Sequence, residues 1–175
     1  MTGKTKSLVL ISFFTALTAV GAFIRIPTPL CPVTLQILFT TLSGVILGSK
    51  GAVSVIVYII LGLVGFPLFS GGGGIGYILH PTFGFLVGMA VGAYVTGRIC
   101  SGNIDSKRLI IGCICGLVPI YTIGTMYCLL ISCVYLKNAQ AAIIIHSCLL
   151  PLPKDVLFCV FAAYIGRKIL RHHLT

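Results

Sequence analysis

Charged residues are sparse along the chain and divide it into long apolar segments. No Lys, Arg, Asp or Glu occurs in residues 7–24, 26–49, 51–97 or 109–136. A helix needs about 20 mostly apolar residues to cross the hydrocarbon core of a bilayer. A soluble domain needs far more ionic residues on its surface than these segments supply. The pattern therefore predicts an integral membrane protein.

The breaks between the apolar segments predict an all-α membrane protein with six transmembrane helices in one domain, residues 1–175. We expect these helices at residues 7–24, 33–47, 52–65, 82–98, 109–136 and 154–169. A loop containing Pro27, Pro29 and Pro32 separates the first two helices, and Phe66-Pro67 ends the third. The third helix is short, which favours a tilted neighbour or a locally thin bilayer.

The basic residues are distributed unevenly between the two ends of the predicted helices. With six crossings, nine of the twelve Lys and Arg residues lie on one side, and only Arg25, Lys137 and Lys154 on the other. The positive-inside rule places the richer side, and with it both termini, in the cytoplasm. The net charge is +10, but the basic residues stand singly or in pairs between apolar segments. This spacing predicts a lipid bilayer as the environment and argues against nucleic acid as a partner.

Three segments on the predicted outer side carry polar groups at one level. Thr34 and Gln36 stand at the start of the second helix, and a buried amide needs a partner on a neighbouring helix or on a ligand. The glycine-rich residues 69–77 let the backbone approach a ligand closely. Lys154 and Asp155 begin the last helix, where they serve either as cap and interface anchor or as a functional pair. Their convergence predicts a pocket for a small molecule.

The chain lacks the residue sets that enzymes and metal sites require. It contains no HExxH, Walker or CxxC motif, and its only acids are Asp105 and Asp155. Asp105 lies in a polar turn on the predicted cytoplasmic side. We therefore expect no catalytic residues, no metal site and no cofactor. An ion-coupled carrier would show internal symmetry and charged residues within its helices, and neither is found.

The outer segments also follow a recognisable order. Residues 26–36 carry three prolines before Thr34 and Gln36, and the glycine-rich segment is followed by Pro-Thr-Phe-Gly-Phe at residues 81–85. Residues 152–155, Leu-Pro-Lys-Asp, begin the last predicted helix. In this order and over the whole chain, these motifs resemble the BioY family. Its members are the biotin-binding substrate-capture (S) components of energy-coupling factor (ECF) transporters.

The resemblance implies six helices around a high-affinity biotin site that opens to the outside of the bacterial cytoplasmic (inner) membrane. It also implies partners, namely a transmembrane coupling subunit and two ATPase subunits, although some members are thought to act alone. S components dock through small residues on the first helix, and Ser12, Ala16 and Ala19 are the candidates here. Close internal helix packing is the alternative role for these residues.

The chemistry of the outer residues suits biotin. An ionised Asp155 accepts the two N–H groups of the ureido ring. Gln36 or a loop N–H donates to the ureido oxygen, and Lys154 or loop amides hold the valerate carboxylate. Aromatic rings pack against the bicyclic rings. The expected substrate-binding residues are Thr34, Gln36, Phe69, Gly73, Gly74, Tyr77, Phe85, Lys154 and Asp155. We also expect the glycine loop to close over the ligand.

The chain departs from the family pattern at two positions. The family commonly has a lysine one turn after the acid, and Phe158 stands there. Lys154 offers a charge from the adjacent position, but neighbouring helical residues point about 100° apart. Phe83 replaces the first glycine of the family's Pro-Thr-Gly-Gly, while the second is kept as Gly84.

Other functions remain open from the residues alone. The chain also suits an S component for another vitamin, or a small membrane scaffold with a lipid-binding pocket. A membrane-embedded enzyme acting on lipid would need paired acids or histidines at the interface, and the single Asp155 argues against it.

Overall fold

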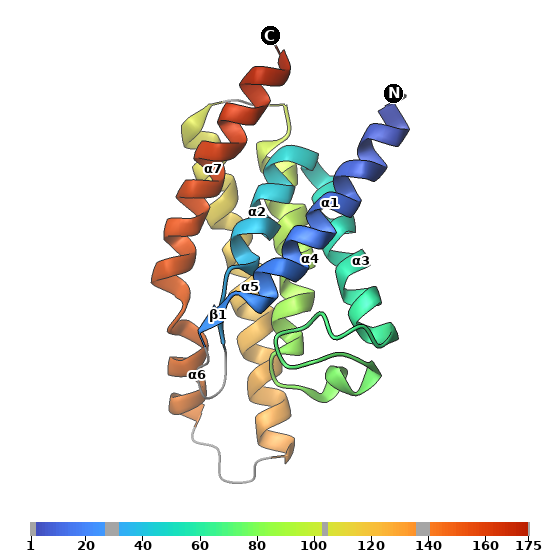
Figure 1. The fold of residues 1–175 in the computed structure, drawn as a ribbon. Coiled ribbons are helices and arrows are strands. Elements are labelled where there is room, and N and C mark those ends of the chain that lie inside the picture. Colours follow the sequence, from blue (N-terminus) through green and yellow to red (C-terminus); the bar gives the residue numbers. More distant parts are fainter. Residues whose placement is uncertain (1–2, 27–31, 103–104, 136–140, 175) are drawn as a thin grey trace.

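The structure is a computed structural model that describes residues 3–26, 32–102, 105–135 and 141–174. It is a helical bundle in which both termini lie at the same end, at the top of Figure 1. The described α-helices are α1 (Gly3–Phe23), α2 (Gln36–Leu47), α3 (Gly51–Val64), α4 (Phe83–Cys100), α5 (Ser106–Tyr135), α6 (Ala141–Leu149) and α7 (Leu152–Leu174). The short 3₁₀ helices are η1 (Gly48–Lys50) and η2 (Ile75–Leu79).

Five segments of the described residues are long and apolar enough to cross a membrane. They are Lys4–Phe23, Gln36–Val64, Phe83–Cys100, Ser106–Val134 and Ala142–Arg171. The chain is therefore a multi-pass membrane protein, as its hydrophobic pattern predicts. The helices α2 and α3 have only 12 and 14 residues and are joined by η1. By length alone they therefore count as one candidate segment and not as two separate crossings.

One helix boundary and one connection differ from the prediction at the end of the bundle opposite the two termini. The second helix starts at Gln36 and not at Val33, because Val33 and Thr34 form strand β2 (Val33–Thr34). This strand pairs antiparallel with β1 (Arg25–Ile26), with Arg25 opposite Thr34. The segment before the last helix contains the additional helix α6, which we predicted as loop. Pro151 separates α6 from α7, since a proline has no N–H with which to continue α6.

Glycines allow α4 and α5 to pack closely in the middle of the bundle. A Cβ atom on Gly88 would lie 2.8 Å from Cα of Ile120, and one on Gly92 would lie 2.5 Å from the carbonyl oxygen of Gly116. Side chains larger than hydrogen have no room at these two positions. The contact therefore fixes α4 and α5 against each other.

The outside of the bundle is apolar, as a lipid-facing surface should be. Large side chains such as Val64, Met126 and Leu157 are about 70% exposed. On α1, the predicted docking residues Ser12 and Ala16 are exposed, whereas Ala19 is half-buried beside the core. Two of these three small residues are therefore available to a neighbouring molecule.

Candidate functional site

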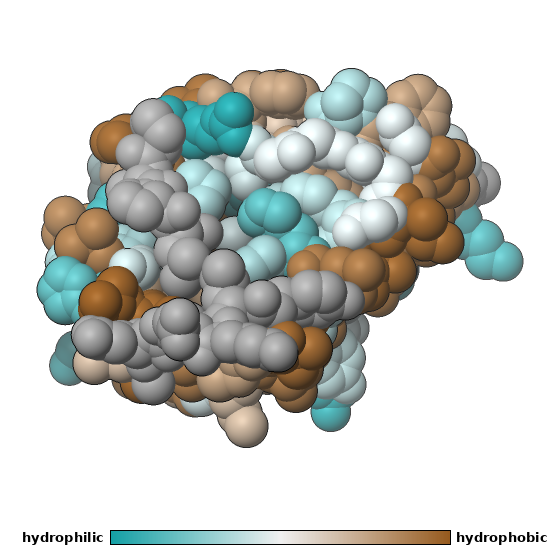
Figure 2. All heavy atoms as spheres, turned by 90° about the horizontal axis from the view of Figure 1, so that it is seen from below, coloured by the Kyte–Doolittle hydropathy of each residue, from teal (hydrophilic) through white to brown (hydrophobic). Residues whose placement is uncertain are grey.

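A cavity lies at the end of the bundle opposite the two termini. It is bounded by α2, the glycine loop, α4, α5 and α7, and its volume is about 60 Å³. Figure 2 looks onto this end and shows pale and teal residues gathered between brown, apolar margins. The lining residues on which the following argument depends are Thr34, Gln36, Tyr77, Phe85, Tyr121, Lys154 and Asp155.

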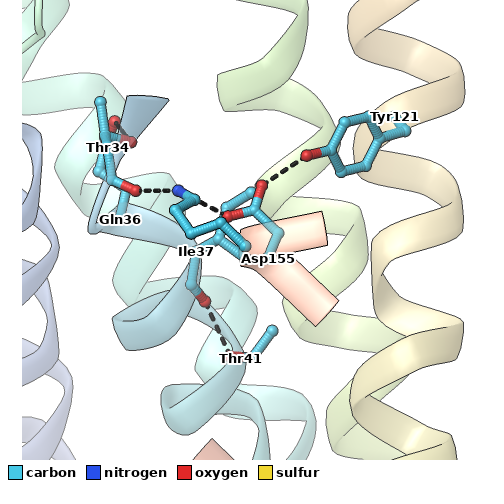
Figure 3. Close-up of polar contacts among 7 residues, drawn as sticks. Thr34, Gln36, Ile37, Thr41, Tyr121 and Asp155 are labelled. Atoms are coloured by element: carbon cyan, nitrogen blue, oxygen red, sulfur yellow. Dashed lines mark hydrogen bonds and ion pairs between the residues drawn. The ribbon is translucent and has the colours of Figure 1, made fainter. Parts of the chain in front are cut away.

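Asp155 is the centre of the polar wall of this cavity. Its side chain is only 1% exposed, although it stands in the first turn of α7. The hydroxyl of Tyr121 on α5 donates a hydrogen bond of 2.5 Å to Asp155 Oδ2. Figure 3 shows this carboxylate between the Tyr121 ring and the start of α2. The other oxygen, Oδ1, lies 2.7 Å from Nζ of Lys154 as an ion pair, so the buried charge is compensated.

Lys154 connects the start of α7 to strand β2. Its ammonium donates to the carbonyl oxygen of Thr34 at 2.5 Å and pairs with the neighbouring Asp155. The ammonium also lies 4.9 Å from the ring centroid of Phe158, within the range of a cation–π contact. Adjacent residues thus bring their charges together, because the long lysine side chain folds back over the helix start. Phe158, one turn after Asp155, thus places its ring against the ammonium of Lys154.

Gln36 bonds a neighbouring helix, which is one of the two roles expected for it. Its Nε2 donates to the hydroxyl of Tyr58 on α3 at 2.9 Å, and its Oε1 accepts from Thr34 Oγ1 at 3.2 Å. The Tyr58 hydroxyl in turn donates to the carbonyl oxygen of Leu68 at 3.1 Å. The start of α2 is therefore tied to α3 and to the segment that enters the glycine loop.

Three aromatic rings in contact with one another stand on the glycine-loop side of the cavity. The ring centroid of Tyr77 lies 4.5 Å from that of Phe69 and 4.8 Å from that of His80, and the His80 ring is nearly parallel to it at 11°. The Tyr77 hydroxyl lies 3.0 Å from Oγ1 of Thr82. Tyr77 lines the cavity, whereas Phe69 is buried behind it at 2% exposure.

His80 completes this aromatic cluster in its neutral form. The His80 side chain is exposed overall, but partial burial of its ring lowers the pKa of His80 from its ordinary value of 6.5, because the charged ring is less well solvated there. Its Nδ1 lies 2.8 Å from Oγ1 of Thr82 and accepts from the Thr82 N–H at 3.4 Å. An Nδ1 that accepts a backbone hydrogen bond carries no proton, so the geometry and the direction of the pKa shift agree.

The glycine loop has a defined backbone. Phe69 and Gly72 exchange two hydrogen bonds of 2.9 and 3.1 Å, and the Gly74 N–H bonds the carbonyl oxygen of Gly62 at 2.7 Å. Gly72 and Gly74 have φ angles of 122° and 97°, which disfavour any other residue. A Cβ atom on Gly73 would lie within 2.2 Å of the Phe66 carbonyl oxygen. These glycines therefore set the shape of the loop.

The structure brings six of the nine predicted substrate-binding residues to one cavity. Thr34, Gln36, Tyr77, Phe85, Lys154 and Asp155 line it, and Phe69, Gly73 and Gly74 do not. Sequence reasoning missed Tyr121 and Tyr58. A signal was present, because a tyrosine inside an apolar helix usually needs a hydrogen-bond partner for its hydroxyl. Within the described parts of the chain, no three His, Cys, Asp or Glu residues cluster as metal ligands would.

Comparison with known proteins identifies the family. The sequence pattern described as the BioY family matches residues 1–174. A probable biotin transporter BioY of Lysinibacillus sphaericus is 51% identical over 128 residues, which cover 71% of this chain and 65% of that relative. A biotin transporter BioY of Rhizobium etli is 32% identical over 181 residues, which cover 95% of this chain and 94% of that relative. These relatives are named as transporters, not as enzymes, in agreement with the sequence prediction.

A solved structure shares the fold. It is a crystal structure at 2.1 Å of the S-component for biotin from an ECF-type ABC transporter. The two chains superpose with a TM-score of 0.80 at 26% identity, over 98% of this chain and 95% of that one. The match over the whole chain, the curated relatives and the shared fold show that this chain belongs to the BioY family.

Proposed function

We propose that this chain captures biotin at the outer face of the bacterial cytoplasmic membrane, as the substrate-binding component of an ECF-type transporter. The observation that carries the proposal is the buried carboxylate of Asp155 in the outer cavity. It is supported by the names of the relatives and of the structural neighbour, all of which refer to biotin.

Asp155 is assigned to the ureido ring of the ligand. That ring offers two N–H donors, and an ionised carboxylate accepts hydrogen bonds without donating any. Hydrogen bonds to a charged acceptor are stronger than those between neutral groups. Gln36 serves the ureido oxygen, since one of its two amide N–H bonds already goes to Tyr58 and the other is available to a ligand. Thr34 lies beside it and orients the Gln36 amide.

The apolar part of the ligand is assigned to the rings of Tyr77 and Phe85, both of which line the cavity. Phe69, Gly73 and Gly74 act on the ligand through the loop: Phe69 supports the ring of Tyr77, and the glycines set the loop backbone. Lys154 compensates the charge of Asp155. Either Lys154 or the loop amides are candidates for the carboxylate end of the ligand.

We propose that the cavity widens to admit the ligand and that the loop then closes over it. Ligand sites usually measure about 300–1,000 Å³, and the cavity has about 60 Å³. Two features border it and are suited to move. One is the glycine loop, whose residues absorb large changes in φ and ψ, and the other is the Lys154–Thr34 hydrogen bond between α7 and β2. We expect the loop to close over bound ligand.

The proposed topology has six crossings with both termini in the cytoplasm. In it, α2 and α3 are separate short crossings, and α6 with α7 forms the last one. The position of both termini at one end of the bundle supports an even number of crossings. The excess of Lys and Arg at that end supports a cytoplasmic location.

The proposed partners are a transmembrane coupling subunit and two ATPase subunits, or none if this chain acts alone. The docking surface is assigned to Ser12, Ala16 and Ala19 on α1, of which the first two are exposed. Small residues on this surface let a helix of the coupling subunit approach closely.

Isothermal titration of the detergent-purified protein with biotin tests the proposal, with riboflavin and thiamine as competing vitamins. We expect one-to-one binding of biotin alone. Asp155→Asn should weaken this binding about 10- to 100-fold, because it removes a charged acceptor. Gln36→Ala should weaken it about tenfold.

Asp105→Asn is the matched control, because it removes the only other acid of the chain, at the opposite end of the bundle. It should bind biotin like the wild type. Binding of another vitamin in place of biotin, or no binding of any vitamin by folded protein, would reject the proposed ligand. Unchanged biotin affinity in both Asp155→Asn and Gln36→Ala would reject the assigned contacts.

A further inference from the structure

We propose that the carboxylate tail of the ligand is held in a second hollow by Arg25 and by the backbone N–H groups of Ser70 and Gly71, and not by Lys154. This inference rests on the proposed function, because it assigns the anionic end of the proposed ligand. It adds Arg25, which lies outside all three sequence motifs, and it decides between Lys154 and the loop amides.

The second hollow lies beside the first cavity at the same end of the bundle. It is formed by the end of α1, strand β1 and the glycine loop, and its volume is about 290 Å³. Arg25, Ser70 and Gly71 line it, together with Phe69. Ser70 also lines the first cavity, so the two spaces adjoin at this residue. A ligand with its rings in the first cavity can therefore extend its tail past Ser70.

The loop carries two adjacent backbone hydrogen-bond donors on residues that line this hollow. Phe69 and Gly72 bond each other through their backbones, which leaves Ser70 and Gly71 at the tip of the turn. Among the described residues, the N–H groups of Ser70 and Gly71 have no hydrogen-bond partner. Successive backbone N–H groups that project from a turn form a site for an anion.

Arg25 supplies a charge that the described structure leaves uncompensated. The chain has only two acids: Asp105 lies in the α4–α5 turn, and Asp155 pairs with Lys154. Pairing of β1 with β2 fixes the backbone of Arg25 opposite Thr34, next to the wall of the first cavity. The planar guanidinium binds a carboxylate through two parallel hydrogen bonds.

Lys154 is the less suitable partner for the tail. Its ammonium is already bonded to the Thr34 carbonyl oxygen and paired with Asp155 at 2.7 Å. A ligand carboxylate placed at Lys154 would also lie close to the carboxylate of Asp155, and like charges repel. The rings and the tail are better separated, with the ureido group at Asp155 and the carboxylate at Arg25.

The test compares biotin with biotinamide, in which a neutral amide replaces the carboxylate, by calorimetry on the full chain. Wild-type protein should bind biotin more tightly than biotinamide. Arg25→Gln should weaken biotin about 10- to 100-fold and leave biotinamide within about twofold, so that the preference for the carboxylate disappears. Arg98→Gln, which removes the same charge at the other end of the bundle, should change neither affinity.

Ser70→Pro provides a second variant that does not touch the charge. It removes the N–H of Ser70 at a turn position that accepts proline, and it should weaken biotin more than biotinamide. If Arg25→Gln proves misfolded on size exclusion, Arg25→Lys takes its place, and it should keep only part of the preference because lysine lacks the guanidinium fork.

Three outcomes overturn the inference. The first is an unchanged preference for biotin in both Arg25→Gln and Ser70→Pro. The second is an equal loss of both ligands in Arg25→Gln, which would make Arg25 structural. The third is loss of the preference in Lys154→Gln but not in Arg25→Gln. If wild-type protein binds no biotin, the proposed function fails first and the inference fails with it.

Discussion

Two parts of the molecule are rich in glycine, α4 and the loop before η2, and glycine has a different physical role in each. On α4, a Cβ atom at Gly88 or Gly92 would enter the backbone of α5, at 2.8 and 2.5 Å. In the loop, a Cβ atom at Gly72 or Gly74 would meet no atom within 4 Å, but both residues have positive φ. Gly88 and Gly92 therefore allow two helices to touch. Gly72 and Gly74 allow the backbone of the loop to adopt positive φ angles.

The difference separates stability from binding in this protein. The α4–α5 contact lies in the core of the bundle, and a change there affects the fold. The loop borders both the first cavity and the second hollow, and we expect a change there to affect ligand binding. Substitutions at glycine should therefore fall into two classes with different measurements, although the sequence shows the same residue.

The largest effect is expected at the helix contact. Gly92→Val places a branched side chain where Cβ itself lies 2.5 Å from the Gly116 carbonyl oxygen. The cost should reach or exceed the about 1–3 kcal/mol typical of overpacked cores, because backbone must move. We expect a strongly lowered thermal midpoint in detergent, or no folded protein. Gly76→Val, where Cβ meets no atom within 4 Å, is the matched control and should keep the wild-type midpoint. Equal midpoints for the two variants would remove the distinction.

Tyr121→Phe should have the next largest effect, and it sharpens the comparison because α5 serves both regions. Ile120 packs on the glycines of α4, and the next residue, Tyr121, donates to Asp155 Oδ2. Loss of that hydroxyl should weaken biotin about tenfold or more, since hydrogen bonds to charged groups contribute about 1.5–3 kcal/mol.

Tyr164→Phe removes the same hydroxyl from a residue of α7 that is 66% exposed, and it should bind biotin normally. A lowered thermal midpoint with unchanged affinity in Tyr121→Phe would assign Tyr121 to the fold alone and not to the position of Asp155.

A smaller effect is expected in the loop. Gly72→Ala forces an alanine to φ near 122°, which costs about 1–2 kcal/mol. Biotin affinity should fall about 5- to 30-fold, because the turn that presents Ser70 and Gly71 changes shape. The thermal midpoint should fall much less than in Gly92→Val. If the biotin affinity of Gly72→Ala is unchanged while its thermal midpoint falls, the loop glycines serve stability, as the glycines of α4 do.

The sequence predicts the helices well because their signal is composition. Long segments without charged residues indicate a lipid environment. The predicted bounds of these segments agree with those of most helices to within a few residues. It fails where the signal is a tertiary contact. The β1–β2 pair depends on residues 25–26 meeting residues 33–34 across a proline-rich loop, and α6 is hidden in a segment that the charge breaks marked as a connection.

The candidate site shows the same division. Thr34, Gln36, Lys154 and Asp155 stand out because each is polar in an apolar chain, and they meet at one cavity. Tyr121 signals only that its hydroxyl needs a hydrogen-bond partner. The sequence does not show which face of the helix the ring occupies, so Asp155 could not be named as that partner. The contact of Lys154 with Asp155 was not expected from helix geometry either, because it depends on the flexibility of the lysine side chain and not on backbone direction.

The smallest effect is expected from pH, through His80 in the aromatic cluster beside the loop. Partial burial lowers the pKa of His80 from 6.5, so the unfolded loop binds a proton more readily than the folded one. The contribution of His80 to loop stability is therefore fully present above about pH 6.5 and decreases as the pH falls below that value. A protonated Nδ1 also loses the hydrogen bond from the Thr82 N–H. Hydrogen exchange of residues 71–80, corrected for intrinsic rates, should increase between pH about 7.5 and about 5.5.

His80→Gln isolates this contribution, because its amide can still accept from the Thr82 N–H but does not titrate in this range. Exchange of the loop in this variant should not change over the same pH interval, while exchange at the α4–α5 contact should be insensitive to pH in both proteins. An equal increase in wild type and variant would assign the pH effect to another group. An increase that extends to α4 and α5 would show that the loop and the helix contact open together, and the separation of the two glycine regions would then be wrong.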